Sequence, residues 1–340
     1  MCLHTAYRLS RPLVKLLDPE RAHDLSLKML SAFCKTSVPP PEVYSLQKNH
    51  IIFRNRIGLA AGFDKNGKYI DSLSSLGFGF IEVGTVTPKP EPGNTKPRLF
   101  RSFSERAVVN RMGFNNDGVD VLSFRLRNSI YRKFGGILGV NIGKNVSTKQ
   151  ENSHEDYLIC IEKVYSLCDY IAVNISSPNS PRLRELQQRQ LLKKLISEIK
   201  QKQREMKDRT GQHTPIFVKF SPDLSQFSID DICKVLSEEE VEGIILTNTT
   251  IERPVEDKVL QKESGGLSGS PLMRQSTRTL KDFSERLKDS DITVIGVGGV
   301  CSAKDAQEKF DNGAHLVQIY SGLIFEGPGL VHQCMADTLP

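Results

Sequence analysis

The sequence lacks long apolar runs, a paired-cysteine motif and a strong excess of charge. No apolar run approaches the roughly 20 residues that a transmembrane helix needs, so none is expected. The first residues contain neither the continuous apolar segment of a secretory signal nor an obvious Arg-rich transit peptide. The seven cysteines include no C-x-x-C pair, which argues against a zinc site or a disulfide framework. We therefore expect a reducing compartment and mostly buried thiols.

The charge balance argues against a dedicated nucleic-acid binder. The formal net charge is +6 over 340 residues, which is mild and fits an anionic substrate or an anionic membrane surface. The basic stretch over residues 182–209 is interrupted by leucines and an isoleucine at helical spacing. That spacing is typical of a solvated outer helix rather than of a nucleic-acid patch, so no nucleic-acid partner is expected.

Residues 1–41 are predicted to form a small helical appendage. Asp18 is a good N-cap because Pro19 and an acidic residue follow it in the first turn. Three consecutive prolines at 39–41 end the second helix, and Pro12 is expected to kink or restart the first. Apolar residues recur at helical spacing in two sets. These are Leu9, Leu13, Leu16 and Leu17, with Arg8, Arg11 and Lys15 between them, and then Ala22, Leu25, Met29, Leu30 and Phe33.

Residues 42–340 alternate short apolar runs with helix-like stretches. Strands that alternate with helices favour a parallel sheet, and eight such units favour a closed barrel over a doubly wound sheet. A barrel of about 250 residues plus an appendage also suits the length. We therefore predict an α/β fold, a (β/α)8 TIM barrel with a small N-terminal helical extension. The predicted strands are residues 57–59, 80–83, 137–140, 170–173, 216–219, 243–246, 293–296 and 316–319.

The most informative segment is residues 174–179, which read Asn-Ile-Ser-Ser-Pro-Asn directly after an apolar strand. Barrels of this kind carry their active sites at the C-terminal ends of the strands. Asn174 and Asn179 can both donate and accept hydrogen bonds, which suits a planar substrate with imide or carboxylate edges. Ser177 has no neighbouring His or Asp, so we expect proton abstraction in a closed pocket rather than acyl transfer. The alternative is a polar turn that caps the next helix.

Polar or small residues follow the other predicted strands as well. Simple turns would not need Lys, Asn and Thr each time, so their convergence on one rim predicts a binding site. The long loop after the second strand adds the amide-rich residues 110–116 as an expected substrate clamp. The segments at the other strand ends are residues 60–65, 84–88, 141–144, 219, 247–250, 296–299 and 320–322.

Two glycines and two lysines indicate what the site binds. Gly298 and Gly299 would let the backbone approach a ligand closely, and the loops after the last two strands of such barrels often bind phosphate. Lys65 and Lys219 are expected to point inward, where a lysine stabilises negative charge on a reduced flavin or an enolate. The alternative for Lys65 is a structural ion pair with Asp64 or another acid.

Taken together, these segments resemble the dihydroorotate dehydrogenase family, in order and spacing across nearly the whole chain. Residues 17–23 resemble the N-terminal extension of its membrane-associated, quinone-reducing class 2 members. The soluble class 1 members lack that extension and carry a cysteine where this chain has Ser177. The matching segments are residues 61–65, 84–87, 110–116, 174–179, 247–250, 265–269 and 320–322.

The resemblance implies an FMN enzyme of pyrimidine (UMP) biosynthesis that oxidises (S)-dihydroorotate to orotate and passes the electrons to a membrane quinone. It implies that Ser177 removes the C5 proton while a hydride moves from C6 to flavin N5, and that Arg101 lies at the quinone tunnel. The implied substrate-binding residues are Lys65, Asn110, Arg111, Met112, Gly113, Phe114, Asn174, Asn179, Asn248 and Thr249. The implied FMN-binding residues are Ala61, Gly62, Phe63, Asp64, Lys65, Thr85, Asn141, Asn174, Lys219, Thr247, Gly269, Gly298, Gly299, Tyr320 and Ser321.

Partners and a location follow from the same resemblance. Residues 1–41 would dock on a lipid bilayer surface and line the quinone tunnel, because amphipathic helices with basic flanks lie in the headgroup plane without spanning it. The alternative is a helical hairpin that only stabilises the barrel. A monomer is implied, at the cytoplasmic face of a bacterial inner membrane or, for a trimmed eukaryotic chain, at the mitochondrial inner membrane.

Two other functions stay open on the sequence alone. One is a soluble relative that uses fumarate or NAD. The other is a non-catalytic flavin- or phosphate-binding barrel in which Ser177 only caps a helix. One position departs from the family pattern, because Arg182 stands where the family usually has glycine. If that position needs a positive φ, arginine is strained there.

Overall fold

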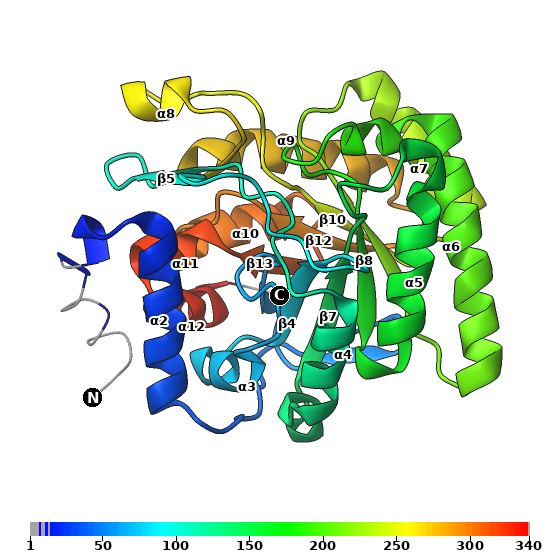
Figure 1. Cartoon of the computed structure of the whole chain (residues 1–340), viewed down its shortest axis with the longest axis horizontal. Coiled ribbons are helices and arrows are strands. Elements are labelled where there is room, and N and C mark those ends of the chain that lie inside the picture. The colour runs from blue at the N-terminus through cyan, green and yellow to red at the C-terminus, as the bar shows by residue number, and fades with distance from the viewer. Residues whose placement is uncertain (1–6, 8–10, 13, 339–340) are drawn as a thin grey trace.

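Eight parallel strands form a closed barrel at the centre of the molecule (Figure 1). The computed structural model describes residue 7, residues 11–12 and residues 14–338. Each barrel strand pairs with the next one along the chain and the last pairs with the first, which confirms the predicted topology. The strands are β3 (Ile57–Leu59), β4 (Phe80–Val86), β7 (Ile137–Ile142), β8 (Tyr170–Asn174), β9 (Ile216–Phe220), β10 (Gly243–Leu246), β12 (Thr293–Val297) and β13 (Leu316–Ile319).

Large rings fill the barrel interior opposite glycines. Phe80, Tyr170 and Phe217 are fully buried, and Tyr170 stacks on Phe217 with ring centroids 4.9 Å apart. A Cβ atom at Gly58 would lie 2.3 Å from the Phe80 ring, and one at Gly139 would lie 2.1 Å from the Tyr170 ring. The glycines are therefore needed because each leaves room for a ring from a neighbouring or facing strand.

Helices surround the barrel, and a second apolar core lies between the two layers. The basic stretch after residue 182 folds as expected into a long outer helix, α6, which buries Leu192, Leu195 and Ile199. The helices after the first barrel strand are α3 (Ile70–Leu73), α4 (Val119–Asn128), α5 (Ser153–Val164), α6 (Arg189–Thr210), α7 (Gln226–Glu238), α8 (Lys258–Lys262), α9 (Met273–Arg286), α10 (Ala303–Asp311), α11 (Ser321–Glu326) and α12 (Gly329–Asp337). Short 3-10 turns are η1 (Ser74–Leu76), η2 (Tyr131–Phe134), η3 (Gln150–Asn152), η4 (Tyr165–Leu167), η5 (Leu183–Gln187) and η6 (Ser270–Leu272).

Two small sheets were not predicted. A hairpin of β1 (Leu46–Lys48) and β2 (Ile51–Phe53) precedes the barrel, and Phe53 packs edge-on against Phe80 of the barrel interior. The segment after β4, expected to be a plain loop, contains β5 (Leu99–Ser102) and β6 (Ala107–Asn110). These two strands join β11 (Gly266–Gly269) in an antiparallel sheet over the barrel mouth.

The N-terminal segment contributes α2 (Pro19–Phe33), which stands beside α3, α11 and α12 in Figure 1. The Asp18 carboxylate accepts hydrogen bonds from the Glu20 and Arg21 N–H groups at 3.1 and 3.0 Å, so the predicted N-cap is confirmed. Residues 11–12 and 14–16 are also helical, while the predicted Arg8, Leu9 and Leu13 lie outside the described residues. Within the described part of the chain, no helix has both the length and the apolar character to cross a membrane.

The apolar residues predicted for α2 divide between two faces. Ala22 is buried against the barrel, together with Leu27, which the sequence pattern missed. Leu25, Met29 and Phe33 instead lie exposed, with 46%, 49% and 79% of their surfaces accessible. The helix therefore presents a second apolar stripe, spaced every four residues, to the outside.

The thiols behave as predicted. Five of the six described cysteines are buried and Cys34 is half-buried, and none of the six is in a disulfide. Burial raises the pKa of the Cys233 and Cys334 thiols to about 12, so these groups are inert at neutral pH.

Candidate functional site

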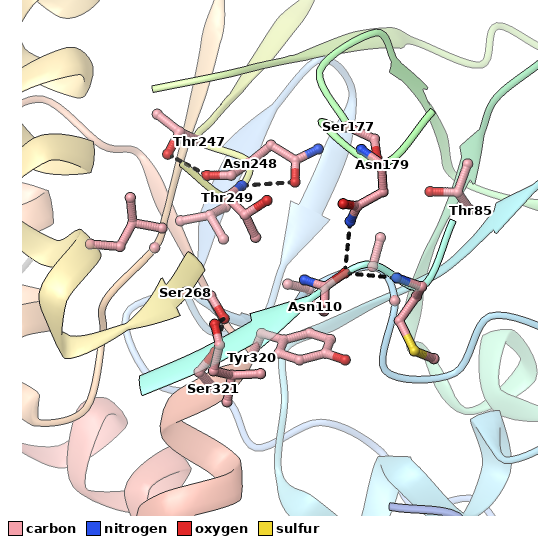
Figure 2. Close-up of a pocket in the computed structure, with 18 of the residues that line it drawn as sticks. Thr85, Asn110, Ser177, Asn179, Thr247, Asn248, Thr249, Ser268, Tyr320 and Ser321 are labelled. Carbon is pink, nitrogen blue, oxygen red and sulfur yellow. Dashed lines mark hydrogen bonds between the residues drawn. The ribbon is translucent and has the colours of Figure 1, made fainter. Parts of the chain in front are cut away.

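A cavity opens at the C-terminal ends of the barrel strands and collects most of the predicted site residues (Figure 2). Segments from sequence positions 60 to 321 meet there, so the predicted convergence on one rim is confirmed. The predicted residues that line it are Ala61, Gly62, Lys65, Thr85, Asn110, Met112, Gly113, Phe114, Asn174, Ser177, Asn179, Lys219, Thr247, Asn248, Thr249, Gly269, Gly298, Gly299, Tyr320 and Ser321.

Four predicted site residues lie behind or beside this cavity. The buried Asp64 accepts hydrogen bonds from the Lys68 and Tyr69 N–H groups at 3.0 and 2.7 Å. It forms no ion pair with Lys65, so the structural alternative for Lys65 is wrong. Arg111 pairs with Glu263 and stacks over an aromatic ring outside the cavity. Phe63 lines a second cavity, and Asn141 lies beneath the first.

Register places Asn141 deeper in the barrel than Asn174, because Asn141 pairs with Ala172 across β7 and β8. Asn141 pairs with Gly84 across β4 and β7, and Asn174 pairs with Lys219 across β8 and β9. Asn141 Oδ1 accepts hydrogen bonds from Thr85 Oγ1 at 2.5 Å and from Asn174 Nδ2 at 3.2 Å. These side chains form a hydrogen-bonded polar layer two residues deep, with Thr85 and Asn174 at the cavity and Asn141 below them.

A buried carboxylate, Glu82 on β4, lies below that layer. It accepts hydrogen bonds from Asn141 Nδ2 at 2.9 Å, from the Tyr170 hydroxyl at 2.9 Å and from Gln318 Nε2 at 2.7 Å. Asn141 therefore turns its NH₂ group down toward Glu82 and its oxygen toward Thr85. Glu82 therefore orients the first amide of the layer above it.

The amides continue around the rim. Asn248 Nδ2 donates to Ser176 Oγ at 3.0 Å, and Asn179 Nδ2 donates to Asn110 Oδ1 at 2.9 Å. Figure 2 shows Asn179 above Asn110, with Asn248 and Thr249 facing them from the opposite side. The Thr249 hydroxyl is buried against Gly266 and has no hydrogen-bond partner among the described residues.

Ser177 lies in the loop after β8 with 7% of its surface exposed. Its hydroxyl oxygen accepts a hydrogen bond from the Asn179 N–H at 3.2 Å, and no His, Asp or Glu side chain among the described residues is bonded to it. The loop thus holds the hydroxyl in place without activating it as a nucleophile. Proton transfer to an ordered acceptor remains the chemistry that suits this environment.

Positive charge enters the cavity from two lysines that make no hydrogen bond or ion pair with any described residue. Burial and the nearby Arg98 lower the pKa of Lys65 to about 8, against the opposing charges of Glu20 and Asp24. Burial also lowers the pKa of Lys219, against the opposing charge of Glu82. Both lysines therefore favour an anionic partner, which would restore the charged state.

The far side of the cavity is formed by a glycine pair and two serines. Gly298 and Gly299 have φ values of +106° and +85°, and a Cβ at Gly299 would lie 2.4 Å from Met273 Cα. A side chain at Gly299 would clash with the start of α9, so glycine lets this loop pack against that helix. Beside them Ser268 and Ser321 share a hydrogen bond at 2.8 Å (Figure 2). The buried Gln318 Oε1, on the cavity floor, has no protein partner.

A second, largely apolar cavity lies between α2 and the barrel. The sequence predicted a cavity lined by Arg101 and by residues 1–41, and both contribute to its lining. Arg101 also donates a hydrogen bond to the Leu17 carbonyl at 2.8 Å. His23 lies edge-on to Phe63 at 4.9 Å, and burial lowers its pKa to about 4. Four side chains line both cavities: His23, Leu99, Val108 and Tyr320.

An ion pair fastens α2 over these cavities. Arg98, itself buried, donates to both carboxylate oxygens of Glu20 at 2.7 and 3.2 Å, and Lys96 lies 3.2 Å from the same carboxylate. Burial alone would raise the pKa of Glu20, but the bonds from Arg98 and Lys96 hold it below its usual range. The pair joins the N-terminal helix to the segment between β4 and β5.

Sequence reasoning missed Glu20, His23, Glu82 and Gln318. Glu82 and Gln318 had a usable signal, because each is a polar residue inside an otherwise apolar strand. Glu20 and His23 had none, since an acidic first turn and a histidine are ordinary on a surface helix. Their place in the site depends on how α2 packs on the barrel.

Comparisons with known proteins agree with this geometry. A family model described as dihydroorotate dehydrogenase matches residues 45–339. A dihydroorotate dehydrogenase (quinone) from Flavobacterium lutescens is 48% identical over 335 residues, covering 97% of this chain and 95% of the relative. Another from Acinetobacter baylyi is 48% identical over 336 residues, covering 97% and 98%.

Solved structures are similar as well. Ligand-free DHODH from Eimeria tenella has a TM-score of 0.86 at 36% identity, covering 94% of this chain and 93% of its own. The same enzyme in complex with ferulenol has a TM-score of 0.85 at 35% identity, covering 94% and 90%.

Proposed function

The chain belongs to the dihydroorotate dehydrogenase family as a quinone-dependent enzyme of pyrimidine biosynthesis, and from that premise we propose how its own residues divide the work. The first cavity takes dihydroorotate and FMN, the cofactor that the family uses. The second takes the quinone. The observation that carries this division is a pair of cavities that share a wall, the first lined by amides, hydroxyls and two lysines and the second lined mostly by apolar side chains.

FMN, when bound, supplies the two-electron chemistry that links dihydroorotate oxidation to quinone reduction. Gly298, Gly299 and Ser321 would hold its phosphate through backbone and hydroxyl groups. Lys219 would face the ring and stabilise the negative charge of the reduced form. Thr85 would lie against the ring edge, and Asn141 would act through Thr85 and Asn174 because it lies one layer below.

Dihydroorotate is planar at its imide edge and carries a carboxylate, and the amides match both. Asn110, Asn174, Asn179 and Asn248 would orient the ring, because each can present a donor and an acceptor. Lys65 would neutralise the substrate's negative charge. Thr249 would form part of the wall around the substrate.

Ser177 is the proposed base for the C5 proton. Its loop is buried, so the proton must leave through an ordered acceptor rather than through bulk solvent. The Asn179 N–H bonded to its oxygen would also steady negative charge that develops there.

The second cavity would receive the quinone from the bilayer. Its walls come from α2, from the segment around Arg101 and from α11, and the exposed stripe of α2 would rest in the lipid interface. We propose a monomer at the cytoplasmic face of a bacterial inner membrane, since its curated relatives are bacterial quinone enzymes.

An anaerobic experiment tests the assignment. Mixing the protein with dihydroorotate should bleach the flavin absorbance, and a short-chain quinone should restore it. Ser177→Ala should slow the bleaching about a hundredfold or more while the bound FMN stays the same, because a positioned base contributes that much. Bleaching at the unaltered rate would contradict the role of Ser177.

A neighbouring serine supplies the control. Ser180 lies in the same loop, is equally buried, and its hydroxyl has no protein partner. Ser180→Ala should leave both the bleaching and the re-oxidation unchanged. If dihydroorotate bleaches no variant although FMN is bound, the substrate assignment itself is wrong.

A further inference from the structure

A lysine is fully buried next to the glycine loop, outside the cavity. Lys309, on α10, has no exposed surface, and its stem packs on the end of β12. A Cβ atom at Gly296 would lie 3.3 Å from Lys309 Cβ and 3.4 Å from its Cδ. Gly296 comes two residues before Gly298, so the lysine lies directly behind the start of the loop.

The ammonium group reaches the loop through one serine. Lys309 Nζ donates to Ser276 Oγ on α9 at 2.6 Å. Ser276 Oγ lies 2.9 Å from the Gly298 carbonyl oxygen and 3.0 Å from that of Met273, and it can donate its one proton to either. A positive donor on the serine oxygen strengthens the bond that the serine makes onward.

This bond sets the direction of one peptide group. The Gly298–Gly299 bond is trans, so the Gly299 N–H points away from the Gly298 carbonyl. With the carbonyl held back toward α9, the N–H turns to the side where Gly299 lines the first cavity. That N–H has no acceptor among the described residues, which leaves it available to a ligand.

Packing alone does not account for a lysine here. Burial lowers the pKa of Lys309 to about 7, although the charges of Glu308 and Asp305 act in the opposite direction. Burying this amine therefore costs free energy of folding. Methionine would fill the same volume without that cost. A buried amine needs a hydrogen-bond partner, and the partner that Lys309 has, Ser276, connects it to the glycine loop.

We propose that Lys309, acting through Ser276, is a positioning residue that aims the Gly299 N–H at the phosphate of the flavin nucleotide and so makes the site prefer FMN to riboflavin. The inference rests on the proposed FMN site. It assigns to α9 and α10 a part in cofactor selection, although neither Lys309 nor Ser276 lines the cavity.

Flavin release from the full-length protein tests the proposal. Diluted holoenzyme is followed by the fluorescence of freed FMN, and the same protein reloaded with riboflavin is followed in parallel. Lys309→Met and Ser276→Ala should each raise the dissociation constant for FMN about tenfold, as expected for the loss of one charge-assisted contact. The dissociation constant for riboflavin should change less than about twofold.

The comparison of two ligands separates positioning from general damage. Equal weakening of both flavins, or no weakening of either, would overturn the proposal. If Lys309→Met does not fold, Ser276→Ala decides alone, because it removes only a hydroxyl. Lys304→Met, an exposed lysine on the same helix, should leave both constants unchanged. If the unaltered protein binds no FMN, the proposed function itself is wrong. That outcome differs from one in which FMN binds but the Lys309 and Ser276 variants do not weaken it selectively.

Discussion

Lys65 is buried in an environment that disfavours its charged form, so the binding of orotate should depend on pH. Its pKa of about 8 means that the side chain loses its proton as pH rises through 8. An orotate anion favours the protonated form, so the dissociation constant for orotate should rise about tenfold between pH 7 and 9. Orotate-induced changes in the flavin spectrum measure it.

Two lysine variants show which lysine causes the pH dependence of orotate binding. Lys65→Met should bind orotate weakly at every pH and show no rise near pH 8. Lys219→Met should keep the rise, because its lysine faces the cofactor side of the cavity. A rise that persists in Lys65→Met would assign the titration to another group.

Arg182, which stands where the family usually has glycine, has a positive φ. Its φ of +56° and ψ of 4° lie in the left-handed region, where glycine is favoured and arginine is strained. Its pairing with Glu185 is exposed and offsets little of that strain. The midpoint of thermal unfolding should therefore rise in the order Arg182, Arg182→Asn, Arg182→Gly. An unchanged midpoint in Arg182→Gly would show that the loop holds no strain.

Single residues also mark how far sequence reasoning reaches. Lys219, Asn174 and Ser177 were predictable because they follow apolar strands whose C-terminal ends must meet. Asn141 was predicted as a cofactor contact but lies one layer lower, and Glu82 beneath it was missed. Depth along a strand depends on barrel shear and register, which local pattern does not encode.

Among the elements, α2 shows an outer face that the barrel does not explain. Replacing Leu25, Met29 and Phe33 with Glu should abolish co-sedimentation with anionic liposomes. The change removes the apolar surface that would insert into the lipid, and it adds negative charges that anionic lipids repel. Bleaching of the flavin by dihydroorotate should stay normal. Reduction of a bilayer-dissolved quinone should fall with the binding.

A second triple variant controls for charge and exposed apolar area. Phe124, Ile159 and Phe227 are comparably exposed on α4, α5 and α7, away from α2. Replacing these three with Glu changes the net charge by the same amount. Equal loss of liposome binding in both triple variants would show that α2 is not the docking face.

The elements also differ in how predictable they were. The eight barrel strands are short, fully buried apolar runs between helical stretches, and all were predicted. The sheet of β5, β6 and β11 was not, because β6 pairs with a strand more than a hundred residues away and its sequence alternates weakly. Partners that distant leave no local periodicity to detect.

At the scale of the whole molecule, Glu82 ties the barrel together across its interior. It is bonded to side chains from β7, β8 and β13 while it sits on β4 itself. Glu82→Leu would leave three buried donors without their acceptor, so the free energy of unfolding should fall by on the order of 3 kcal/mol. Urea unfolding measures it.

The amide variant of the same residue gives the matched comparison. Glu82→Gln keeps the shape and one acceptor oxygen, so it should lose clearly less stability than Glu82→Leu. The Tyr170 hydroxyl can rotate to accept from the new NH₂ group. Equal stability of Glu82→Leu and the unaltered protein would mean that the interior network contributes nothing to the fold.

The wall of His23, Leu99, Val108 and Tyr320 is one side chain thick and belongs to both cavities. With a water-soluble reactant on one side and a lipid-soluble one on the other, neither has to leave before its counterpart arrives. Under the proposed assignment the two electrons would cross this shared wall, while the two protons that the quinone takes up on reduction would reach it separately, so neither reactant has to pass through the wall. The protein would then work at the boundary between water and lipid, and its turnover would depend on how fast each phase supplies its own reactant.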